Sequence, residues 1–322
     1  MKLRNGMIAL AIATIICCVS SAAGQSYPTK PIRLLVPYAP GGATDITARV
    51  LAPKLGESLG QQVIVDNRPG ANGIVATSVL VKSASDGHTI MLVDSAHGAN
   101  PALYSKMSYD TLKDFTAIGL ATRIPMVLLV NPSLPAKSVK ELIALAKSRP
   151  GKLNYASAGT GSSIFLATEL FKSATDIEVV QIAYKGGGPA LAEVIGGQVP
   201  LMFITIAAAM AHVKAGRVLA LGVSSLQRSA AYPEVPTVAE SGVPGFEFHL
   251  WQAMIAPAGV MRPIIAQLNG DLNAALGHAD VKERLSGLGA EIAGSTPERA
   301  TEFIRSEVER WRKTIKPDMR IE

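Results

Sequence analysis

The chain has 322 residues, a formal net charge of +6 and two cysteines, Cys17 and Cys18. A chain of this length can bury the apolar core of one large or two ordinary domains. The positive charge is mild and no Lys/Arg cluster with interleaved aromatic residues accompanies it, so the composition gives no support for nucleic-acid binding.

The N-terminus has the three-part pattern of a secretory signal peptide. Lys2 and Arg4 precede an apolar run over residues 7–19, and small residues follow at 20–24. The apolar run is too short for a membrane span, which favours cleavage after residue 24 over a membrane anchor. Both cysteines lie in this segment. We therefore expect residues 1–24 to be removed, leaving a mature chain without disulfides and with a formal charge of +4.

The first segment of the mature chain is predicted to be a strand, a glycine turn and a helix. The apolar run Ile32–Val36 is followed by Gly41 and Gly42, and apolar residues at helical spacing then continue to Gly60. Bare N–H groups at a helix start favour a carboxylate or phosphate, and Asp45 would lie in the first helical turn. Ordinary loop chemistry explains a single glycine turn equally well.

Two further units repeat this arrangement. A strand at Val63–Val65 leads into the glycine-rich segment Asn67–Gly73 and a helix, and a strand at Thr89–Val93 leads into the polar loop Asp94–Asn100. Alternating strands and helices indicate a parallel sheet covered by helices. Because ligands bind beyond the carboxyl ends of such strands, we expect these loops to converge.

A second αβ series follows a break. Residues Tyr109–Arg123 show no clean period, and the apolar run Met126–Val130 then begins the new series. Ser138 and Glu141 form a capping box for a helix that Pro150 ends. We expect the second domain to start here.

Two turns of this series have the composition of carboxylate-binding turns. The strand Lys152–Ala156 leads into a turn of small and hydroxyl residues, Ser157–Ser163, and the strand Val179–Ala183 leads into Tyr184–Pro189, which contains Lys185. N-capping by the serines is the competing interpretation of the first turn. The second turn matches neither nucleotide-binding glycine pattern.

The remaining elements complete the alternation. We predict, in order, a strand at Pro200–Ile206, a helix at Ala207–Ala215, a strand at Val218–Val223, an apolar run at Leu250–Ala256, and two amphipathic helices, one over residues 264–276 and one over 304–315 capped at Ser295–Glu298.

The sequence offers little for an enzyme. The five histidines have no H-E-x-x-H spacing, no G-x-S-x-G elbow is present, and the mature chain has no cysteine nucleophile. Asp45 could be a general base, but its place in the first turn of a helix is better explained by the favourable interaction of a carboxylate with the positive end of the helix dipole. We expect no cofactor and no catalytic or metal site.

These residues together resemble the periplasmic solute-binding proteins of tripartite tricarboxylate transporters, the Bug or TctC-like family. The resemblance covers essentially the whole mature chain and is carried by Tyr27-Pro28 with Lys30-Pro31, Pro40-Gly41-Gly42 with Asp45, Asn67 to Ala71 with Gly73, Asn100-Pro101 with Leu103-Tyr104, Tyr155-Ala156-Ser157 with Gly159 to Ser162, Tyr184-Lys185-Gly186, Gly196-Gly197-Gln198, and Trp251 with Ala256 to Gly259.

The resemblance implies an α/β, two-lobed periplasmic-binding-protein fold of the Venus flytrap kind, type II-like, in which each lobe is a mostly parallel sheet flanked by helices. Lobe 1 would comprise residues 25–123 and 250–322, and lobe 2 residues 124–249. A small carboxylate would bind between the lobes, held mainly by backbone N–H groups and hydroxyls. The implied ligand-binding residues are Tyr38, Gly41, Gly42, Ala43, Asp45, Ser95, His97, Asn100, Ala158, Gly159, Thr160, Gly161, Ser162, Ser163, Lys185, Gly186 and Thr205.

The implied function is capture of a di- or tricarboxylate or an aromatic carboxylate in the periplasm and its delivery to a membrane permease made of other polypeptides. The protein is expected to be a monomer that binds no nucleic acid. A ligand sensor acting on a signalling receptor would need the same lobes, and a secreted α/β enzyme is the third alternative.

The chain departs from the family pattern after Phe203. The family commonly has an Asp-Asn pair followed by Pro, where this chain has Ile204, Thr205, Ile206 and Ala207. A wall without that carboxylate suits a second carboxylate or an apolar body better than an ammonium group. We therefore expect carboxylates without an amino group to bind more tightly than amino acids.

Overall fold

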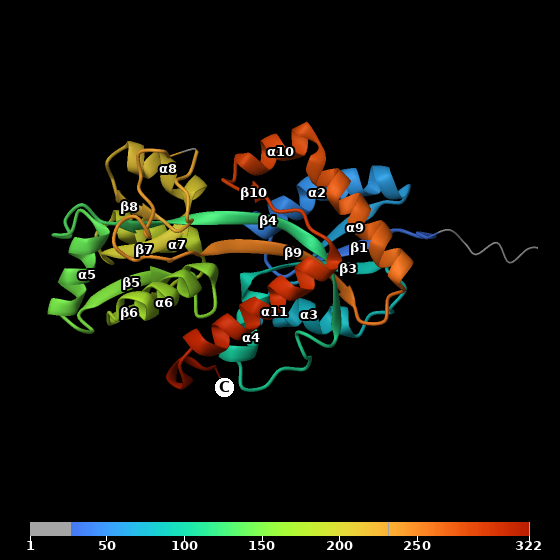
Figure 1. Cartoon of the computed structure of the whole chain (residues 1–322), viewed down its shortest axis with the longest axis horizontal. Helices are drawn as coiled ribbons and strands as arrows, with labels where there is room; N and C mark the ends of the chain where they lie inside the picture. Colours follow the sequence, from blue (N-terminus) through green and yellow to red (C-terminus); the bar gives the residue numbers. More distant parts are fainter. Residues whose placement is uncertain (1–26, 231, 322) are drawn as a thin grey trace, which may run out of the picture.

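The computed structural model describes residues 27–230 and 232–321. Figure 1 shows two lobes side by side, with two long strands running from one into the other. The predicted signal segment, residues 1–24, lies outside the described residues.

The larger lobe is built from both ends of the described chain. Its first elements are β1 (Ile32–Val36), α2 (Ala43–Leu59), β2 (Val63–Asn67), η2 (Ala71–Gly73), α3 (Ile74–Val81), β3 (Thr89–Asp94) and α4 (Ser95–Leu103). Its last elements are β9 (His249–Pro257), α9 (Arg262–Gly277), α10 (Ala279–Ser286), β10 (Glu291–Ile292), α11 (Pro297–Thr314) and η3 (Pro317–Met319).

The smaller lobe comes from the middle of the chain. Its elements are the distal half of β4 (Phe115–Val130), then α5 (Val139–Ser148), β5 (Leu153–Ser157), α6 (Ser163–Thr175), β6 (Val179–Ala183), α7 (Gly187–Ile195), β7 (Leu201–Thr205), α8 (Ile206–Lys214) and β8 (Leu219–Val223).

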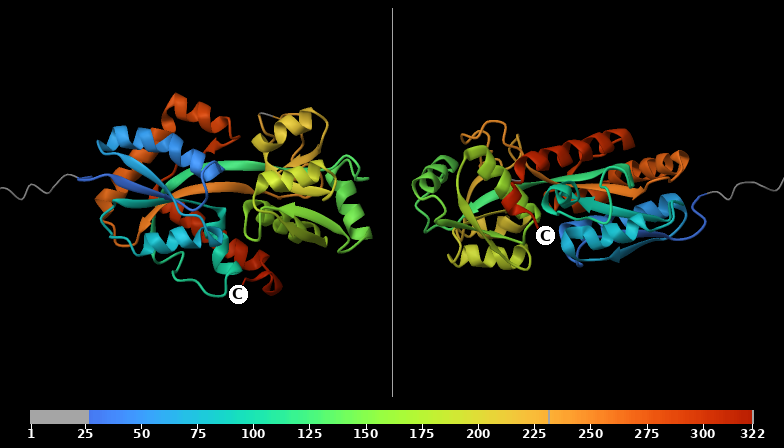
Figure 2. Two further views of the ribbon diagram at one scale, coloured as in Figure 1. Left: turned by 180° about the vertical axis from the view of Figure 1, so that it is seen from behind. Right: turned by 90° about the horizontal axis from the view of Figure 1, so that it is seen from below.

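One continuous sheet runs through both lobes in the order β2-β1-β3-β9-β4-β7-β5-β6, with β8 and β10 each paired to β4. In the larger lobe β1 is parallel to β2 and β3, and in the smaller lobe β5 is parallel to β6 and β7. The two long strands β4 and β9 are antiparallel to each other and to their other neighbours. The α/β, two-lobed expectation is confirmed, and the antiparallel pair joins the two parallel sets (Figure 2).

Helices cover both faces of the sheet in the larger lobe. Leu34 belongs to a buried cluster under α2, α9 and α10, and its neighbour Leu35 belongs to a second cluster under α3 and α11. Since successive residues of a strand point to opposite faces, both faces of β1 are buried. This explains why the strand is almost continuously apolar.

A third buried cluster fills the smaller lobe and also includes residues of the larger one. Ala99 and Leu103 of α4, together with Trp311 and Ile315 at the end of α11, pack against it. On this basis we propose that the lobes divide near Arg123 and His249, with α4 and α11 reaching across the division.

The predicted break before the second series is wrong in its second half. Residues from Phe115 onward belong to β4, a strand of 16 residues. This segment shows no alternation because α9 and α11 pack on opposite faces of the strand, and Ile118 and Leu120 are buried on those two faces. A strand buried on both sides has no polar face to reveal its period.

Two helices of the larger lobe, α4 and α11, begin differently from the sequence prediction. The polar segment predicted as a loop after β3 is the helix α4, which Asp94 caps by accepting a hydrogen bond from the Ala96 N–H (3.0 Å). The helix α11 is capped by Thr296, and Ser295 instead accepts a hydrogen bond from the Leu120 N–H (3.0 Å). A further short helix, α10, was not predicted.

Candidate functional site

The predicted binding turns all follow strands at their carboxyl ends, and three of them start helices without a side-chain cap. The helices α2, α7 and α8 begin after Gly42, Gly186 and Thr205, and none of these residues provides a side-chain cap. An uncapped helix start leaves backbone N–H groups free to donate hydrogen bonds to a ligand carboxylate.

Asp45 organises the turn between β1 and α2. Its carboxylate is buried and accepts hydrogen bonds from the Gly41 N–H (2.9 Å), the Arg49 guanidinium (3.0 Å) and the Asn67 side chain (2.8 Å). Burial opposes ionisation of Asp45, but these hydrogen bonds outweigh it and lower the pKa of the carboxyl. Asp45 therefore holds Gly41 in place, while Gly41 and Gly42 themselves are exposed and Ala43 is half-buried.

Tyr38 connects this turn to the start of α4. Its hydroxyl donates a hydrogen bond to Asp94 (2.9 Å), and its backbone carbonyl accepts one from Asn67 (2.9 Å). Burial raises the pKa of Asp94 to about 6. Burial and the neighbouring Asp94 raise the pKa of Tyr38 well above its usual value, so the phenol remains a donor.

The three candidates of the predicted 95–100 loop lie in the protein interior. Ser95, His97 and Asn100 are all buried in α4. The His97 ring packs against both Tyr109 and Phe115, with centroid distances of 6.3 Å and 5.6 Å. Burial lowers the pKa of His97 to about 4, so the ring is neutral near neutral pH.

Several polar atoms of this helix have no hydrogen-bond partner within the described part of the chain. They are the Ser95 hydroxyl, both ring nitrogens of His97 and the Asn100 carbonyl oxygen. The Asn100 amide nitrogen does have a partner, since it donates to the Asn72 carbonyl (3.1 Å). Buried polar atoms of this kind usually bind internal water.

The turn between β5 and α6 is held mostly by its own hydroxyls. Ser162 caps α6 by accepting from the Phe165 N–H (3.3 Å) and donates to the Gly159 carbonyl (2.7 Å). The Thr160 hydroxyl donates to Gln181 (3.3 Å). The N-capping interpretation of Ser162 is therefore confirmed. Ala158, Gly159, Thr160 and Ser163 are half-buried, and Gly161 is buried.

The other two predicted turns are more open. Lys185 is exposed beside the half-buried Gly186, whose φ of 124° is accessible to glycine and strained for other residues. Thr205 is half-buried at the start of α8. Ile206 and Ala207 lie at ordinary contact distance from the position that a side chain on Gly289 of the larger lobe would take, 3.8 Å and 4.0 Å.

The residues that sequence reasoning missed are those that connect the turns. Asn67 and Asp94 bind Tyr38, Arg49 binds Asp45, and Asn72 donates to the Thr160 carbonyl in the other lobe (3.4 Å). Asn67 and Asp94 each end a strand, so their positions could have suggested a site role. Nothing in the sequence pairs Asn72 with Thr160.

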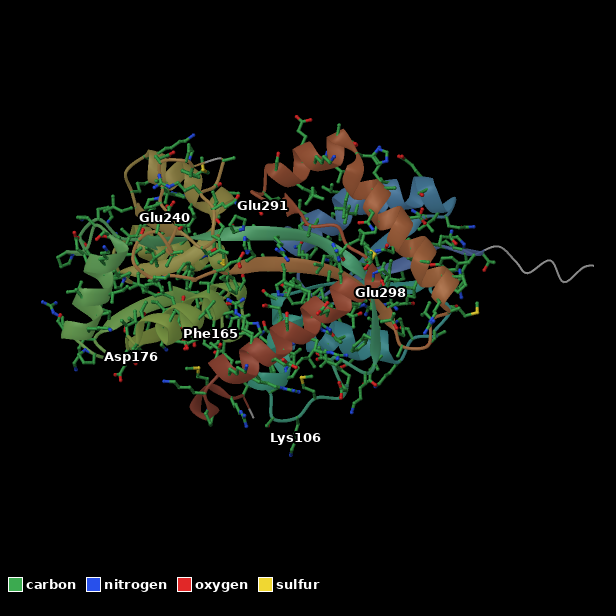
Figure 3. All side chains as sticks on the ribbon, in the orientation of Figure 1. Lys106, Phe165, Asp176, Glu240, Glu291 and Glu298 are labelled. Carbon is green, nitrogen blue, oxygen red and sulfur yellow. The ribbon has the colours of Figure 1, made fainter. Side chains whose placement is uncertain are left out.

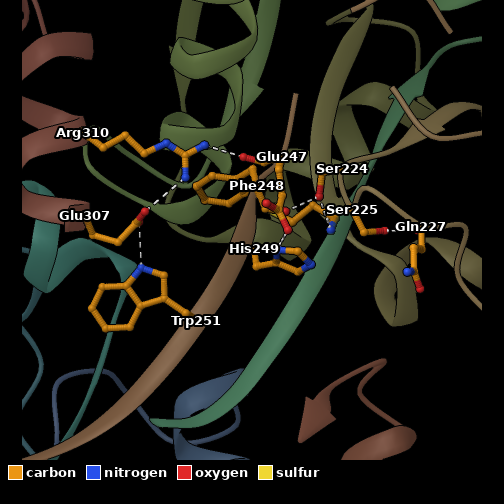
Figure 4. A network of polar contacts seen from close by, with 10 residues as sticks. Ser224, Ser225, Gln227, Glu247, Phe248, His249, Trp251, Glu307 and Arg310 are labelled. Carbon is orange, nitrogen blue, oxygen red and sulfur yellow. Dashed lines mark hydrogen bonds and ion pairs between the residues drawn. The ribbon is translucent and has the colours of Figure 1, made fainter. Parts of the chain in front are cut away.

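A polar network lies where the long strands pass between the lobes (Figure 4). Ser224 accepts from the Met126 N–H (2.8 Å) and donates to the Phe248 carbonyl (2.6 Å), so it joins the chain segments of both strands. Nearby, the Glu307 carboxylate accepts from the Trp251 indole (2.9 Å) and from Arg310 (3.1 Å). This network fixes the strands at the crossing.

Arg310 and His249 also belong to this region, where the long strands pass between the lobes. Arg310 of α11 also donates to the Glu247 carbonyl, just before β9 begins. Burial, together with the charges of Arg123 and Arg310, lowers the pKa of His249 to about 4, so this histidine is neutral near neutral pH.

Two sizeable surface grooves lie apart from the predicted turns. One, of about 1120 Å³, lies between α9 and α11, and another, of about 790 Å³, lies between α2 and β2. No group of three or more His, Cys, Asp or Glu suited to a metal occurs among residues 27–230 and 232–321. Within the same residues, no helix combines the length and apolarity that crossing a membrane requires.

Comparison with known proteins gives consistent matches. A family model described as "Tripartite tricarboxylate transporter family receptor" matches residues 47–318. Protein BugT of Bordetella pertussis is 39% identical over 306 residues, covering 94% of this chain and 93% of BugT.

Two solved structures of the same kind contain ligands. A protein of R. palustris solved with adipate is 36% identical with a TM-score of 0.80, covering 89% of this chain and 97% of that one. MatC of Rhodopseudomonas palustris, solved with bound malate, is 33% identical with a TM-score of 0.80, covering 90% of this chain and 100% of MatC.

Proposed function

Because the chain belongs to the tripartite tricarboxylate transporter receptor family, we propose that it captures a small dicarboxylate between its two lobes and delivers it to a tripartite permease. It is a carboxylate-binding solute receptor, as expected from the sequence. The observation that carries the proposal is that two relatives covering nearly the whole chain were solved with adipate and with malate, both dicarboxylates.

The proposed binding residues are those of the turns that start α2, α6, α7 and α8. The backbone N–H groups of the exposed Gly42 and the half-buried Ala43 would donate hydrogen bonds from the larger lobe to one carboxylate of the ligand. The start of α7 and the exposed Lys185 would bind the other end of the ligand from the smaller lobe. Contacts from both lobes at once would stabilise the closed arrangement by population shift.

The ligand class follows from the wall of the smaller lobe. Ile204 and Ile206 flank Thr205, and both isoleucines are buried, so this segment presents no carboxylate to the ligand. An ammonium group there would lose water without gaining an ionic partner. We infer that a dicarboxylate without an amino group is preferred.

The remaining assignments complete the proposal. The protein acts in the periplasm after removal of residues 1–24, as a monomer and as a receptor without catalytic activity. The residues that the sequence predicts to bind ligand remain our proposed site, and we assign Ser95, His97 and Asn100 an indirect role in it because they are buried.

A thermal-shift and calorimetric screen of the mature chain tests this function. The panel contains adipate, malate and succinate, the amino acids aspartate and 2-aminoadipate, and neutral succinamide. A ligand at a hundredfold excess over its Kd stabilises the folded state by about 2.7 kcal/mol. Stabilisation by dicarboxylates alone supports the proposal, and equal binding of aspartate and malate contradicts the inferred wall.

A charge variant locates the site. Lys185→Met removes the exposed cation beside α7 and is expected to raise the Kd of the best dicarboxylate about two- to fivefold, because an exposed ionic contact contributes less than about 1 kcal/mol. Lys152→Met is the matched control, since Lys152 is also exposed but lies just before the N-terminal end of β5, opposite to the end that carries the predicted turn. Equal effects of the two variants would refute the assignment of Lys185.

A further inference from the structure

Asn72 bridges the two lobes at the turn that starts α6. It lies in η2 of the larger lobe and has a left-handed backbone conformation, with φ 54° and ψ 35°. Its side-chain amide donates to the Thr160 carbonyl of the smaller lobe at 3.4 Å, across 88 residues of sequence. The Asn72 carbonyl in turn accepts from the Asn100 side chain at 3.1 Å, which ties it to α4.

Gly161 makes room for this contact. A side-chain carbon on Gly161 would come within 1.8 Å of the Asn72 amide nitrogen and 3.0 Å of the Leu103 side chain. Distances below 3.0 Å are not tolerated between such atoms, so any other residue at 161 would displace Asn72. The sequence predicts Gly161 to contact the ligand. The structure adds a steric reason for glycine at this position, which is the close approach of Asn72.

We propose that Asn72 is a positioning residue for the ligand-binding turn of the smaller lobe, and that the contact of Asn72 with Thr160 over Gly161 sets the affinity and lifetime of the ligand complex. The proposal rests on the proposed function and adds a residue of the larger lobe to it. In this role Asn72 acts through the backbone of the turn. It fixes the Thr160 carbonyl, and thereby the backbone of Ala158–Ser163, relative to the opposite lobe.

The first test is Asn72→Gly, because glycine adopts the left-handed conformation without strain and only the bridging side chain is lost. The matched control is Asp176→Gly. Asp176 also has φ 54°, but it is exposed and ends α6 far from the larger lobe (Figure 3).

For the best dicarboxylate we expect Asn72→Gly to raise Kd about three- to tenfold, mainly through a faster dissociation rate, as expected for one lost hydrogen bond. Asp176→Gly should leave both quantities within a factor of about 1.5. Hydrogen exchange of the ligand-free protein should become faster over residues 158–166 in Asn72→Gly and remain unchanged there in Asp176→Gly.

The isosteric variant Asn72→Asp separates positioning from packing. Its carboxylate cannot donate to the Thr160 carbonyl at pH 7, but the protonated acid can donate near pH 4. The groups that Asn72 contacts, the Thr160 carbonyl and the Asn100 amide, are uncharged. The ratio of the Asn72→Asp Kd to the wild-type Kd should therefore fall several-fold between pH 7 and pH 4, and a constant ratio contradicts the proposal.

A second pair tests the steric half. Gly161→Ala should weaken binding at least as much as Asn72→Gly, whereas Gly216→Ala should not. Gly216 is also left-handed, with φ 66°, but has open space where a side chain would stand. Unchanged exchange over residues 158–166 in Asn72→Gly, or an unchanged Kd, overturns the proposal. If wild-type protein binds no carboxylate, the proposed function fails, and the exchange of the ligand-free protein still decides the positioning role.

Discussion

Replacing Asp94 by asparagine should stabilise the protein at neutral pH. Both hydrogen bonds of Asp94, from the Tyr38 hydroxyl and the Ala96 N–H, use the same carboxylate oxygen, Oδ1. Asparagine retains an acceptor oxygen at that position and adds no bulk. The variant therefore keeps the cap of α4 and removes only the buried negative charge.

The magnitude follows from the pKa of Asp94. Burial raises this pKa from 3.8 to about 6, so between these values the folded protein binds more protons at Asp94 than the unfolded chain does. Under that condition stability decreases as pH rises. The difference corresponds to about 3 kcal/mol, lost between pH 3.8 and 6 and constant above. Asp94→Asn is neutral throughout and avoids this loss.

Urea unfolding of wild type and Asp94→Asn at several pH values from 4 to 8 measures the effect. The stability advantage of the variant should grow by about 2 kcal/mol between pH 4 and pH 6.5 and then level off. The exposed Asp176→Asn serves as control and should differ from wild type by less than about 0.5 kcal/mol. An advantage that does not change with pH, or a loss of stability at pH 7, would refute the reasoning.

Three further predictions concern stability, all measured by urea unfolding. Asp45→Asn should lower the free energy of unfolding by about 2–3 kcal/mol at pH 7, because Asp45 accepts several charge-assisted hydrogen bonds. Since the pKa of Asp45 is lowered in the folded protein, this loss should shrink as pH falls below 3.8, and a loss that is constant down to pH 3 would contradict the prediction. Ser224→Ala should cost about 2–3 kcal/mol by leaving a buried N–H and a buried carbonyl unpaired, and a cost below about 0.5 kcal/mol would show that the strand crossing is held otherwise. Gly270 lies within α9 with open space around the position of a side chain, so Gly270→Ala should raise the free energy of unfolding by about 0.5–1 kcal/mol. Gly119→Ala should lower it by about 1–3 kcal/mol, because the new side chain would come within 2.9 Å of the Asn269 amide. Changes of the same sign in the two variants would disprove this contrast.

The alternation of strands, glycine turns and helices could be predicted because its signals are local. The strand Ile32–Val36 and the glycines after it are contiguous, and the structure places β1 over the same residues. The capping pair at Ser138 and Glu141 is equally local, with the Glu141 N–H donating to Ser138. Such signals need only the neighbouring residues to be read.

The elements and contacts that sequence reasoning missed depend on partners far away in the chain. The length of β4 is hidden because distant helices bury both its faces, and α4 is hidden because Pro101 and polar residues give it the composition of a loop. Asp45 was expected to contact ligand or water, but Asn67, 22 residues away, reaches its carboxylate. Only the folded sheet brings Asn72 to Thr160.

The position of β9 in the sheet determines the order in which the protein can be assembled. β9 lies between β3 and β4, and its Ile255 pairs with Met91. A growing chain that has synthesised β1 to β4 therefore still lacks the strand that joins them, and the intervening lobe must emerge first. Contacts of such long sequence separation slow folding and leave strand edges unpaired meanwhile. The larger lobe thus depends on the last quarter of the polypeptide, and a fragment ending at Val130 should remain unfolded and prone to aggregate.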